Sequence, residues 1–370
     1  MSFRPALTPL AQSLPATVPF VGPETQERAR GAPFRARLGA NESGFGPAPS
    51  VIDAMARAAG LAWRYCDPEN FDLKQALATQ LGVAPDTIAV GEGIDGLLGL
   101  VVRLFAAPGA TVVTSLGAYP TFNYHVAGFG ARLVTVPYRN DHEDLDGLAE
   151  AARREKASLC YLANPDNPMG TWWDADAVVR FIEALPEHTM LVLDEAYGET
   201  APAGALPPVD VERPNVLRMR TFSKAYGLAG LRCGYAIGER EQIRAFDKVR
   251  NHFGVNRMAQ AAALAALADQ AWLEPIVGKV AAGRDRIAAI AAENGLAALP
   301  SATNFVTIDC GRDGAYAQKV MDALLGAGIF VRKPMAPGLD RCIRVSTGPG
   351  AELALFATEL PGALAAAAAG

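Results

Sequence analysis

Several residue types are scarce in this chain, and each scarcity argues against a class of protein. The 370 residues include only seven lysines, five cysteines and four histidines. The cysteines are isolated and odd in number, which indicates reduced thiols in a cytoplasmic protein rather than a disulfide framework. The histidines lie far apart, without the H-x-x-x-H spacing of a metal-binding helix, so no metal site is predicted.

Long apolar runs and basic runs are also missing. No stretch reaches about 18 uninterrupted apolar residues, the length that spans a bilayer, and the N-terminal region lacks the pattern of a signal peptide. The net charge is −5 and no basic cluster stands out, so neither nucleic acid nor an anionic membrane is an expected partner. With 50% hydrophobic residues, the chain is long enough for two or three ordinary globular domains.

One of the rare lysines lies in the segment TFSKAYGLAGLR, residues 221–232. Lys224 follows the hydroxyl residues Thr221 and Ser223, and burial would lower its pKa by penalising the charged form. Such an amine is a nucleophile that can form a Schiff base with an aldehyde, and Arg232 could clamp a phosphate. Pyridoxal 5′-phosphate (PLP) carries both groups. On this segment alone, a structural lysine beside an unrelated arginine is the alternative.

Short apolar runs alternate with helical patterns through the first two thirds of the chain. Strands are predicted at residues 87–90, 111–115, 133–136, 158–162, 190–193, 216–220 and 233–237. This alternation predicts an α/β fold with a mostly parallel sheet and helices on both faces.

The domain organisation follows from changes in this pattern. Residues 1–35 are proline-rich and are interpreted as an irregular arm. Residues 36–270 are expected to form the large domain, and residues 271–370 a smaller α/β domain that packs with the arm. A single alanine-rich helix over 258–294 is predicted to connect the two domains.

Residues 91–96, GEGIDG, follow the first predicted strand of the large domain. They match G-x-G-x-x-G, which is typical of a dinucleotide site or of a phosphate cradle at a helix N-terminus. A dinucleotide site needs an acidic residue about 20 positions later, and residues 109–119 contain none. The cradle for a single phosphate is therefore favoured.

Polar and aromatic residues follow other strands, at the sheet edge where ligands of open α/β sheets bind. Tyr119 could stack on a flat ring, or simply pack. Asn167 and Tyr197 could hydrogen-bond a phenolate oxygen, although Asn167 also suits a plain turn. Asp194 ends an apolar strand and needs a partner, either a protonated pyridine nitrogen or a helix N-terminus. A protonated pyridine ring would act as an electron sink.

Taken in order, these motifs resemble the fold-type I PLP-dependent aminotransferases of class I and II, and are most similar to histidinol-phosphate aminotransferases. The resemblance covers residues 38–348 and is most specific at 164–170, 193–197 and 220–235. It implies that Lys224 binds the cofactor aldehyde and shuttles protons, and that Asp194 pairs with the pyridine nitrogen. The other implied cofactor residues are Gly93, Ile94, Asp95, Tyr119, Asn167, Tyr197, Thr221, Ser223 and Arg232.

The resemblance also implies a homodimer with shared sites, because Tyr65 matches a tyrosine that binds the phosphate in the neighbouring subunit. Arg344 matches the arginine that clamps the substrate carboxylate. Asn41 and Phe20 are expected near the substrate. Arg332 could face an anionic or polar substrate tail, or could form an ordinary salt bridge.

The implied activity is transfer of an amino group from histidinol phosphate, or from an aromatic or other neutral amino acid, to 2-oxoglutarate. A PLP decarboxylase of the threonine-phosphate type, or a racemase, would share every cofactor residue and stays open. The chain departs from the family pattern at five positions. Ile94 stands where serine is usual, Gly96 where an acidic residue is usual, and Met169 where threonine is usual. Cys66 replaces a usual proline, and Phe20 replaces a tyrosine that is frequent in histidinol-phosphate enzymes. These departures leave the cofactor chemistry intact but bear on the identity of the donor.

Overall fold

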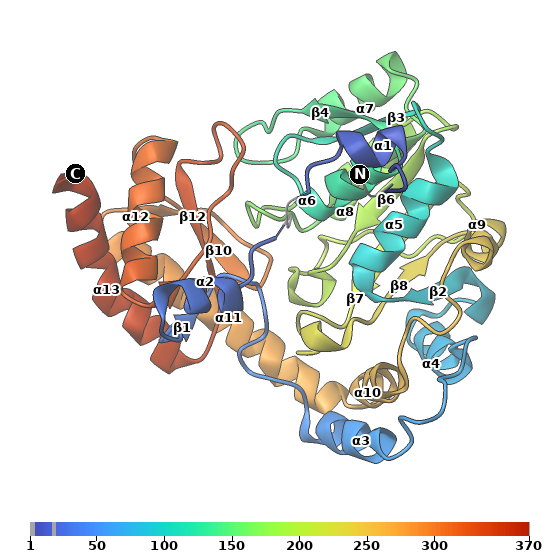
Figure 1. The fold of residues 1–370 in the computed structure, drawn as a ribbon, viewed down its shortest axis with the longest axis horizontal. Coiled ribbons are helices and arrows are strands. Elements are labelled where there is room, and N and C mark those ends of the chain that lie inside the picture. Colours follow the sequence, from blue (N-terminus) through green and yellow to red (C-terminus); the bar gives the residue numbers. More distant parts are fainter. Residues whose placement is uncertain (1–3, 17–19, 370) are drawn as a thin grey trace.

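A seven-stranded sheet forms the centre of the computed structural model, which describes residues 4–16 and 20–369 (Figure 1). The strand order is β2-β8-β7-β6-β5-β3-β4, and β8 alone runs opposite in direction to the other six strands. The predicted mostly parallel α/β sheet is therefore confirmed. Its strands are β2 (Ile88–Gly91), β3 (Thr111–Ser115), β4 (Arg132–Val136), β5 (Leu159–Ala163), β6 (Met190–Asp194), β7 (Val216–Thr221) and β8 (Gly234–Ile237).

Helices cover both faces of this sheet because neighbouring strand residues point to opposite sides. Leu159 and Tyr161 of β5 pack with α5 (Gly93–Phe105) and α6 (Pro120–Gly128), which defines the front face. Cys160 and Leu162 pack with α7 (Leu145–Arg154) and α8 (Ala175–Ala184) on the back face. A further apolar cluster joins β2 and β8 to α3 (Pro49–Ala59), α4 (Phe71–Leu81) and α10 (Arg257–Ala268).

The C-terminal third builds a second apolar core around smaller sheets. Strands β12 (Cys342–Ser346), β10 (Phe305–Asp309) and β9 (Ala297–Ala298) pair antiparallel, while β11 (Ile329–Phe330) pairs parallel with β1 (Ala36–Arg37). The helices packed on them are α11 (Gln270–Glu293), α12 (Gly314–Gly326) and α13 (Gly350–Ala369). The division into an arm, a large domain and a small domain stays a prediction.

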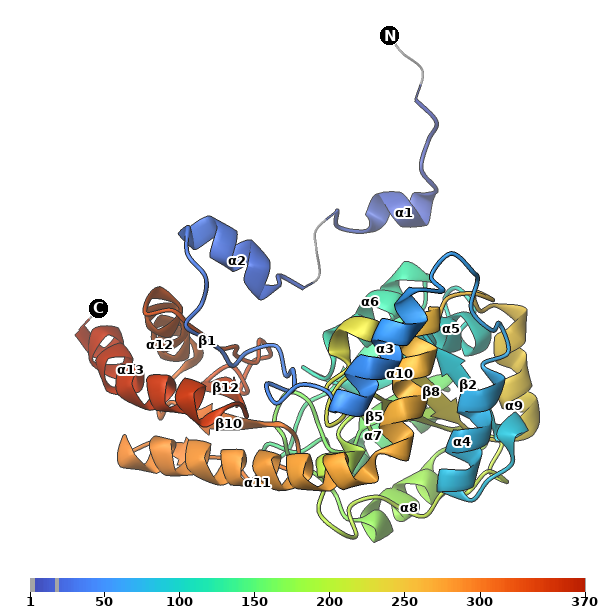
Figure 2. The ribbon, with the colours of Figure 1, turned by 90° about the horizontal axis from the view of Figure 1, so that it is seen from below.

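The single helix predicted over 258–294 is wrong, because the chain breaks at Asp269 between α10 and α11. The Asp269 carboxylate accepts a hydrogen bond from the backbone N–H of Trp272 at 3.2 Å and so caps the second helix. It also accepts one from the Ser50 hydroxyl at 2.5 Å, which ties the break to α3. Figure 2 shows α11 running from the C-terminal unit towards α10.

The N-terminal arm is also more regular than predicted. It contains α1 (Pro9–Ser13) and α2 (Pro23–Arg30), and each begins with a proline, whose fixed φ suits the first position of a helix. At the other end of the chain, α13 is long and apolar enough to cross a membrane. Its Leu353, Phe356 and Leu360 are instead buried in the second core.

Candidate active site

The ends of β6 and β7 bring the predicted lysine and the predicted aspartate into one region. β6 pairs in parallel with β7, so Asp194 at the end of β6 lies beside the end of β7. The loop that follows β7 carries Ser223 and Lys224. This is the sheet edge at which ligands of open α/β folds bind.

The amine of Lys224 is held near Asn41 and Tyr197. Its Nζ donates a hydrogen bond to the Asn41 carbonyl at 3.2 Å and lies 5.5 Å from the centre of the Tyr197 ring. The pKa of Lys224 is lowered to about 8, chiefly by burial and then by the positive charges of Arg344 and Arg232, against the opposing effect of Asp95 and Asp194. An amine with this pKa is partly unprotonated near neutral pH, as a nucleophile or a general base requires.

Asp194 is buried and lies on the front face of the sheet. Its carboxylate accepts hydrogen bonds from the Tyr161 hydroxyl at 2.8 Å and from the Ala196 backbone N–H at 2.9 Å. Burial raises the pKa of Asp194 to about 6, and these hydrogen bonds oppose the rise. Tyr161 was not predicted from the sequence, where its only signal is a hydroxyl-bearing ring within an apolar strand.

Asn41 joins the N-terminal region to both halves of the site. It is buried with a left-handed φ of 55°, and its side-chain amide donates to the Tyr197 hydroxyl at 3.0 Å. Ser346 donates to the Asn41 side-chain oxygen at 3.0 Å, and the Asn304 amide donates to the Asn41 carbonyl at 3.0 Å. Ser346 and Asn304 come from the second core and were not predicted from the sequence.

The residues predicted to cradle a phosphate lie where β2 leads into α5. Gly93 has a φ of 73°, and a Cβ atom there would lie 2.7 Å from Nη2 of Arg232. Only glycine therefore allows this close approach. Arg232 donates to Asp95 at 3.1 Å and to the Ser223 hydroxyl at 3.4 Å. The Thr221 hydroxyl donates to the Ser223 hydroxyl at 3.0 Å.

Tyr119 and Ile94, two further residues predicted to bind the cofactor, have different surroundings. The Tyr119 hydroxyl donates to Asp95 at 2.6 Å, which holds the Tyr119 ring beside the cradle. Ile94, by contrast, is buried in the front-face core. Its side chain is therefore occupied by packing, and its backbone N–H is the group it can offer to a ligand.

Two arginines lie side by side in the C-terminal part of the site. Nη1 of Arg344 donates to the Asn167 side-chain oxygen at 2.5 Å, and its Nε is buried without a hydrogen-bond partner. Arg332 pairs with Arg344 through the backbone, and the Arg332 guanidinium lies 4.2 Å from the centre of the half-exposed Phe20 ring. Burial, and then the charge of Arg344, lowers the pKa of Arg332 to about 10. Neither arginine has an acidic ion-pair partner within the described residues.

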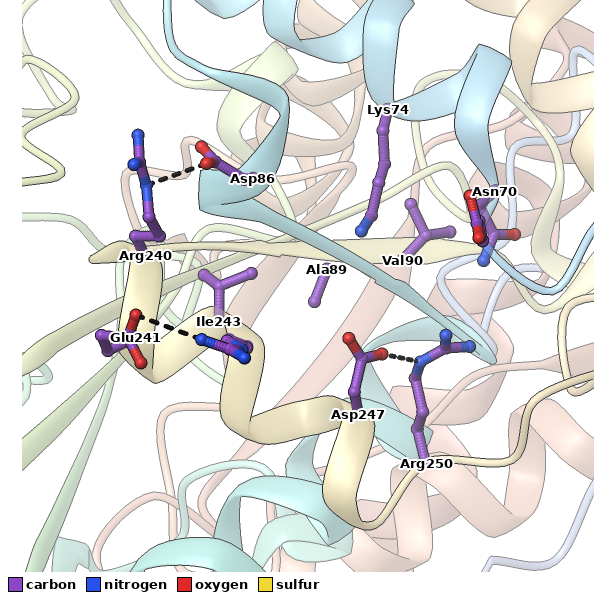
Figure 3. Close-up of a pocket in the computed structure, with 12 residues that line it drawn as sticks. Asn70, Lys74, Asp86, Ala89, Val90, Arg240, Glu241, Ile243, Asp247 and Arg250 are labelled. Carbon is purple, nitrogen blue, oxygen red and sulfur yellow. Dashed lines mark hydrogen bonds and ion pairs between the residues drawn. The ribbon is translucent and has the colours of Figure 1, made fainter.

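Tyr65 is the one predicted site residue that the chain does not bring to this region. Tyr65 is 79% exposed, and its ring packs at a tilt of 32° against Phe253, with ring centres 4.7 Å apart. A separate cavity of about 270 Å³ lies beside β2 (Figure 3). Lys74 points into it from α4, and none of the predicted site residues lines it.

The model of the class I and II aminotransferase family matches residues 36–360. This chain belongs to that family. The histidinol-phosphate aminotransferase of Anaeromyxobacter sp. (strain Fw109-5) is 37% identical over 349 residues, which cover 93% of this chain and 95% of the relative. The aromatic amino acid aminotransferase of Mycobacterium avium (strain 104) is 38% identical over 352 residues, 94% of each chain.

Solved structures of aminotransferases give the same result. The crystal structure of histidinol-phosphate aminotransferase from Sinorhizobium meliloti, in complex with pyridoxal 5′-phosphate, matches this aminotransferase with a TM-score of 0.96 and 60% identity. The match covers 98% of this chain and 99% of that one. L-threonine-O-3-phosphate decarboxylase from Porphyromonas gingivalis shares the fold, with a TM-score of 0.76 over 89% of this chain and 99% of its own at 21% identity. The predicted family and fold class are confirmed.

Proposed function

We propose that this aminotransferase uses PLP to transfer the amino group of histidinol phosphate to 2-oxoglutarate. The observation that carries the proposal is that Lys224, with its lowered pKa, and the buried carboxylate Asp194 share one site at the ends of adjacent strands. The donor is supported by the 60% identity to the S. meliloti histidinol-phosphate aminotransferase. An aromatic amino acid is the second candidate donor, favoured by the M. avium relative.

The residues present fit PLP. Asp194 is buried, its pKa is raised, and no basic side chain forms an ion pair with it in the described part of the chain, so a protonated ring nitrogen would supply its missing partner. At the other end, Gly93 leaves room for Arg232 and backbone N–H groups to approach the same phosphate. Thr221 and Ser223 add hydroxyl donors there.

The remaining side chains of the site would each bind one part of the cofactor or move a proton. Lys224 would hold the cofactor aldehyde, Tyr119 would cover the ring, and Asn167 and Tyr197 would donate to the phenolate oxygen. PLP, when bound, withdraws electrons from the bonds of the substrate α-carbon. The Nζ of Lys224 would accept the α-proton and deliver it to C4′, the carbon of the cofactor's aldehyde group, which suits an amine whose pKa is about 8.

Arg344 and Arg332 would select the substrate. Both guanidinium groups are partly buried and lack an acidic ion-pair partner in the described chain, and each has a buried Nε without a hydrogen bond. An anion would satisfy these donors and offset their desolvation. We assign Arg344 to the carboxylate of the acceptor and Arg332, beside Phe20, to the polar or anionic tail of the donor.

A donor screen tests this proposal. The purified protein, supplied with PLP and 2-oxoglutarate, should form glutamate fastest with histidinol phosphate, while aromatic amino acids serve as the comparison series. Release of carbon dioxide, or inversion of the amino acid without a 2-oxo product, would assign the decarboxylase or racemase reaction instead. A protein that stays colourless with PLP would contradict the whole proposal.

We also propose a homodimer in which Tyr65 completes the neighbouring site, and a cytoplasmic location. Tyr65 and Phe253 contact each other and are 79% and 50% exposed, and Trp63, two residues before Tyr65, is 76% exposed. Exposed apolar patches of this kind favour protein contacts. Tyr65→Phe should weaken PLP binding, whereas Tyr124→Phe, which removes another exposed hydroxyl, should not. Sedimentation should give a dimer; a monomer with full PLP affinity would contradict this assignment.

A further inference from the structure

A buried ionic cluster lies directly behind the site and takes no part in the chemistry above. Glu195 is fully buried, and its Oε1 accepts hydrogen bonds from Nε and Nη2 of Arg218 at 2.9 and 2.5 Å. Its other oxygen, Oε2, accepts from Nε of Arg220 at 2.9 Å. One carboxylate, on the residue directly after β6, is thus bonded to two guanidinium groups on β7.

The position of this cluster follows from strand alternation. Asp194 and Glu195 are consecutive, so the first faces the front of the sheet and the second faces the back. Arg220 and Thr221 are consecutive at the end of β7 and alternate in the same way. Each member of the ionic pair therefore adjoins, along the backbone, a residue that would contact the cofactor on the front face.

The two arginines differ in what else they bind. Arg218 also donates to the carbonyls of Pro207 and Pro208, at 2.8 and 2.7 Å, and so holds the β6–β7 connection. Among the described residues, Arg220 has no such backbone contact, and the other acid near it, Glu199, has a buried oxygen without a hydrogen-bond partner. Burial raises the pKa of Glu199 to about 7, so Glu195 is the main counter-charge of Arg220 at neutral pH.

We propose that Glu195 is a positioning residue that acts through Arg220, by fixing the end of β7 against the end of β6. It would thereby set the spacing between Asp194 and the segment from Thr221 to Lys224, which must hold opposite ends of one rigid ring. The Glu195–Arg218 pair would serve the stability of the fold alone. This inference rests on the proposed function.

The test compares Arg220→Lys with its matched control Arg218→Lys. Lysine keeps the charge but loses the planar fork that binds the carboxylate. We expect Arg220→Lys to weaken PLP binding about tenfold or more, the scale of one charge-assisted hydrogen bond. It should also shift the pH midpoint of the bound cofactor's visible band. Arg218→Lys should lower the thermal unfolding midpoint but leave PLP affinity within about twofold.

Equal changes in PLP affinity for the two variants, or changes in thermal stability alone, would overturn the positioning role. Glu195→Gln should reproduce the Arg220→Lys effect on PLP binding if it folds; the arginine pair decides the matter if it does not. The wild-type titration separates this result from the proposed function. If the wild-type protein takes up PLP and shows the band, only the positioning role is at stake.

Discussion

Removal of the Lys224 amine should stabilise the protein when no cofactor is bound, and should do so only where the amine is charged. In the folded chain the pKa of Lys224 falls from its usual 10.5 to about 8, chiefly because burial penalises the ammonium form. The unfolded chain keeps the usual value. A Lys224→Met variant lacks this penalty at every pH.

The sign and size follow from proton linkage. Below about pH 8 Lys224 is protonated in both states, and the penalty is complete, at about 2 to 3 kcal/mol after allowance for its partial solvent access. Between about pH 8 and 10.5 the folded state releases the proton while the unfolded state keeps it, so the penalty falls by up to about 1.4 kcal/mol per pH unit. Above that range no penalty remains.

The assay is urea unfolding of cofactor-free wild-type and Lys224→Met protein at pH 7.5 and pH 10. The advantage of the variant should shrink by about 2 kcal/mol between the two pH values. Lys319→Met, at an exposed lysine of α12, corrects for other groups that titrate at high pH. An advantage that is the same at both pH values would refute the lowered pKa and, with it, the argument that Lys224 is available as a free amine.

Three further predictions concern other charged groups. Asp194→Asn should reduce turnover by orders of magnitude, because the ring loses its electron-sink character. It should also stabilise the cofactor-free protein above pH 6, where the raised pKa of the wild-type carboxyl makes ionisation unfavourable; urea unfolding at pH 5 and pH 7.5 checks this. Arg344→Met should raise KM for the 2-oxo acid about 10- to 100-fold, since a charge-assisted hydrogen bond is lost. Saturation kinetics with a monocarboxylate and a dicarboxylate acceptor measure this effect, and an unchanged KM would remove the clamp assignment. Lys74→Met should raise the thermal unfolding midpoint, because burial lowers the pKa of Lys74 and no ion pair is recorded for it in the described chain; Lys319→Met is again the control.

The sequence predicted those parts of the site that depend on strand order. A buried strand followed by Asp194, and another followed by Thr221 and Lys224, meet at one sheet edge whenever the sheet is parallel. The glycine cradle before α5 was predictable for the same reason, because its position after a strand is a local property. The family resemblance then supplied a role for each residue.

Contacts between distant segments were outside the reach of such reasoning. The Asn41–Tyr197 hydrogen bond joins residues 156 positions apart, and Asn304 reaches Asn41 from the second core. The hydrophobic periodicity of the sequence does not predict such pairings, because they depend on how the two apolar cores pack against each other. The break at Asp269 is different, because its capping interaction is local and an aspartate within an alanine-rich run is a recognisable helix start.

The charged side chains of the site affect the pKa of Lys224 in opposite ways. Arg344 lies on one side of Lys224 and Arg232 at the cradle, and both lower the pKa of the lysine beyond the effect of burial. The arginines predicted to bind anions therefore also favour the unprotonated form of the amine. Asp95 and then Asp194 oppose this effect, and burial raises the pKa of Asp194 itself. Arg344 and Arg232 thus lie where anions are expected, Arg232 in an ion pair with Asp95, and Asp194 lies where a ring cation is expected. This order would align a substrate carboxylate, the lysine and the cofactor ring.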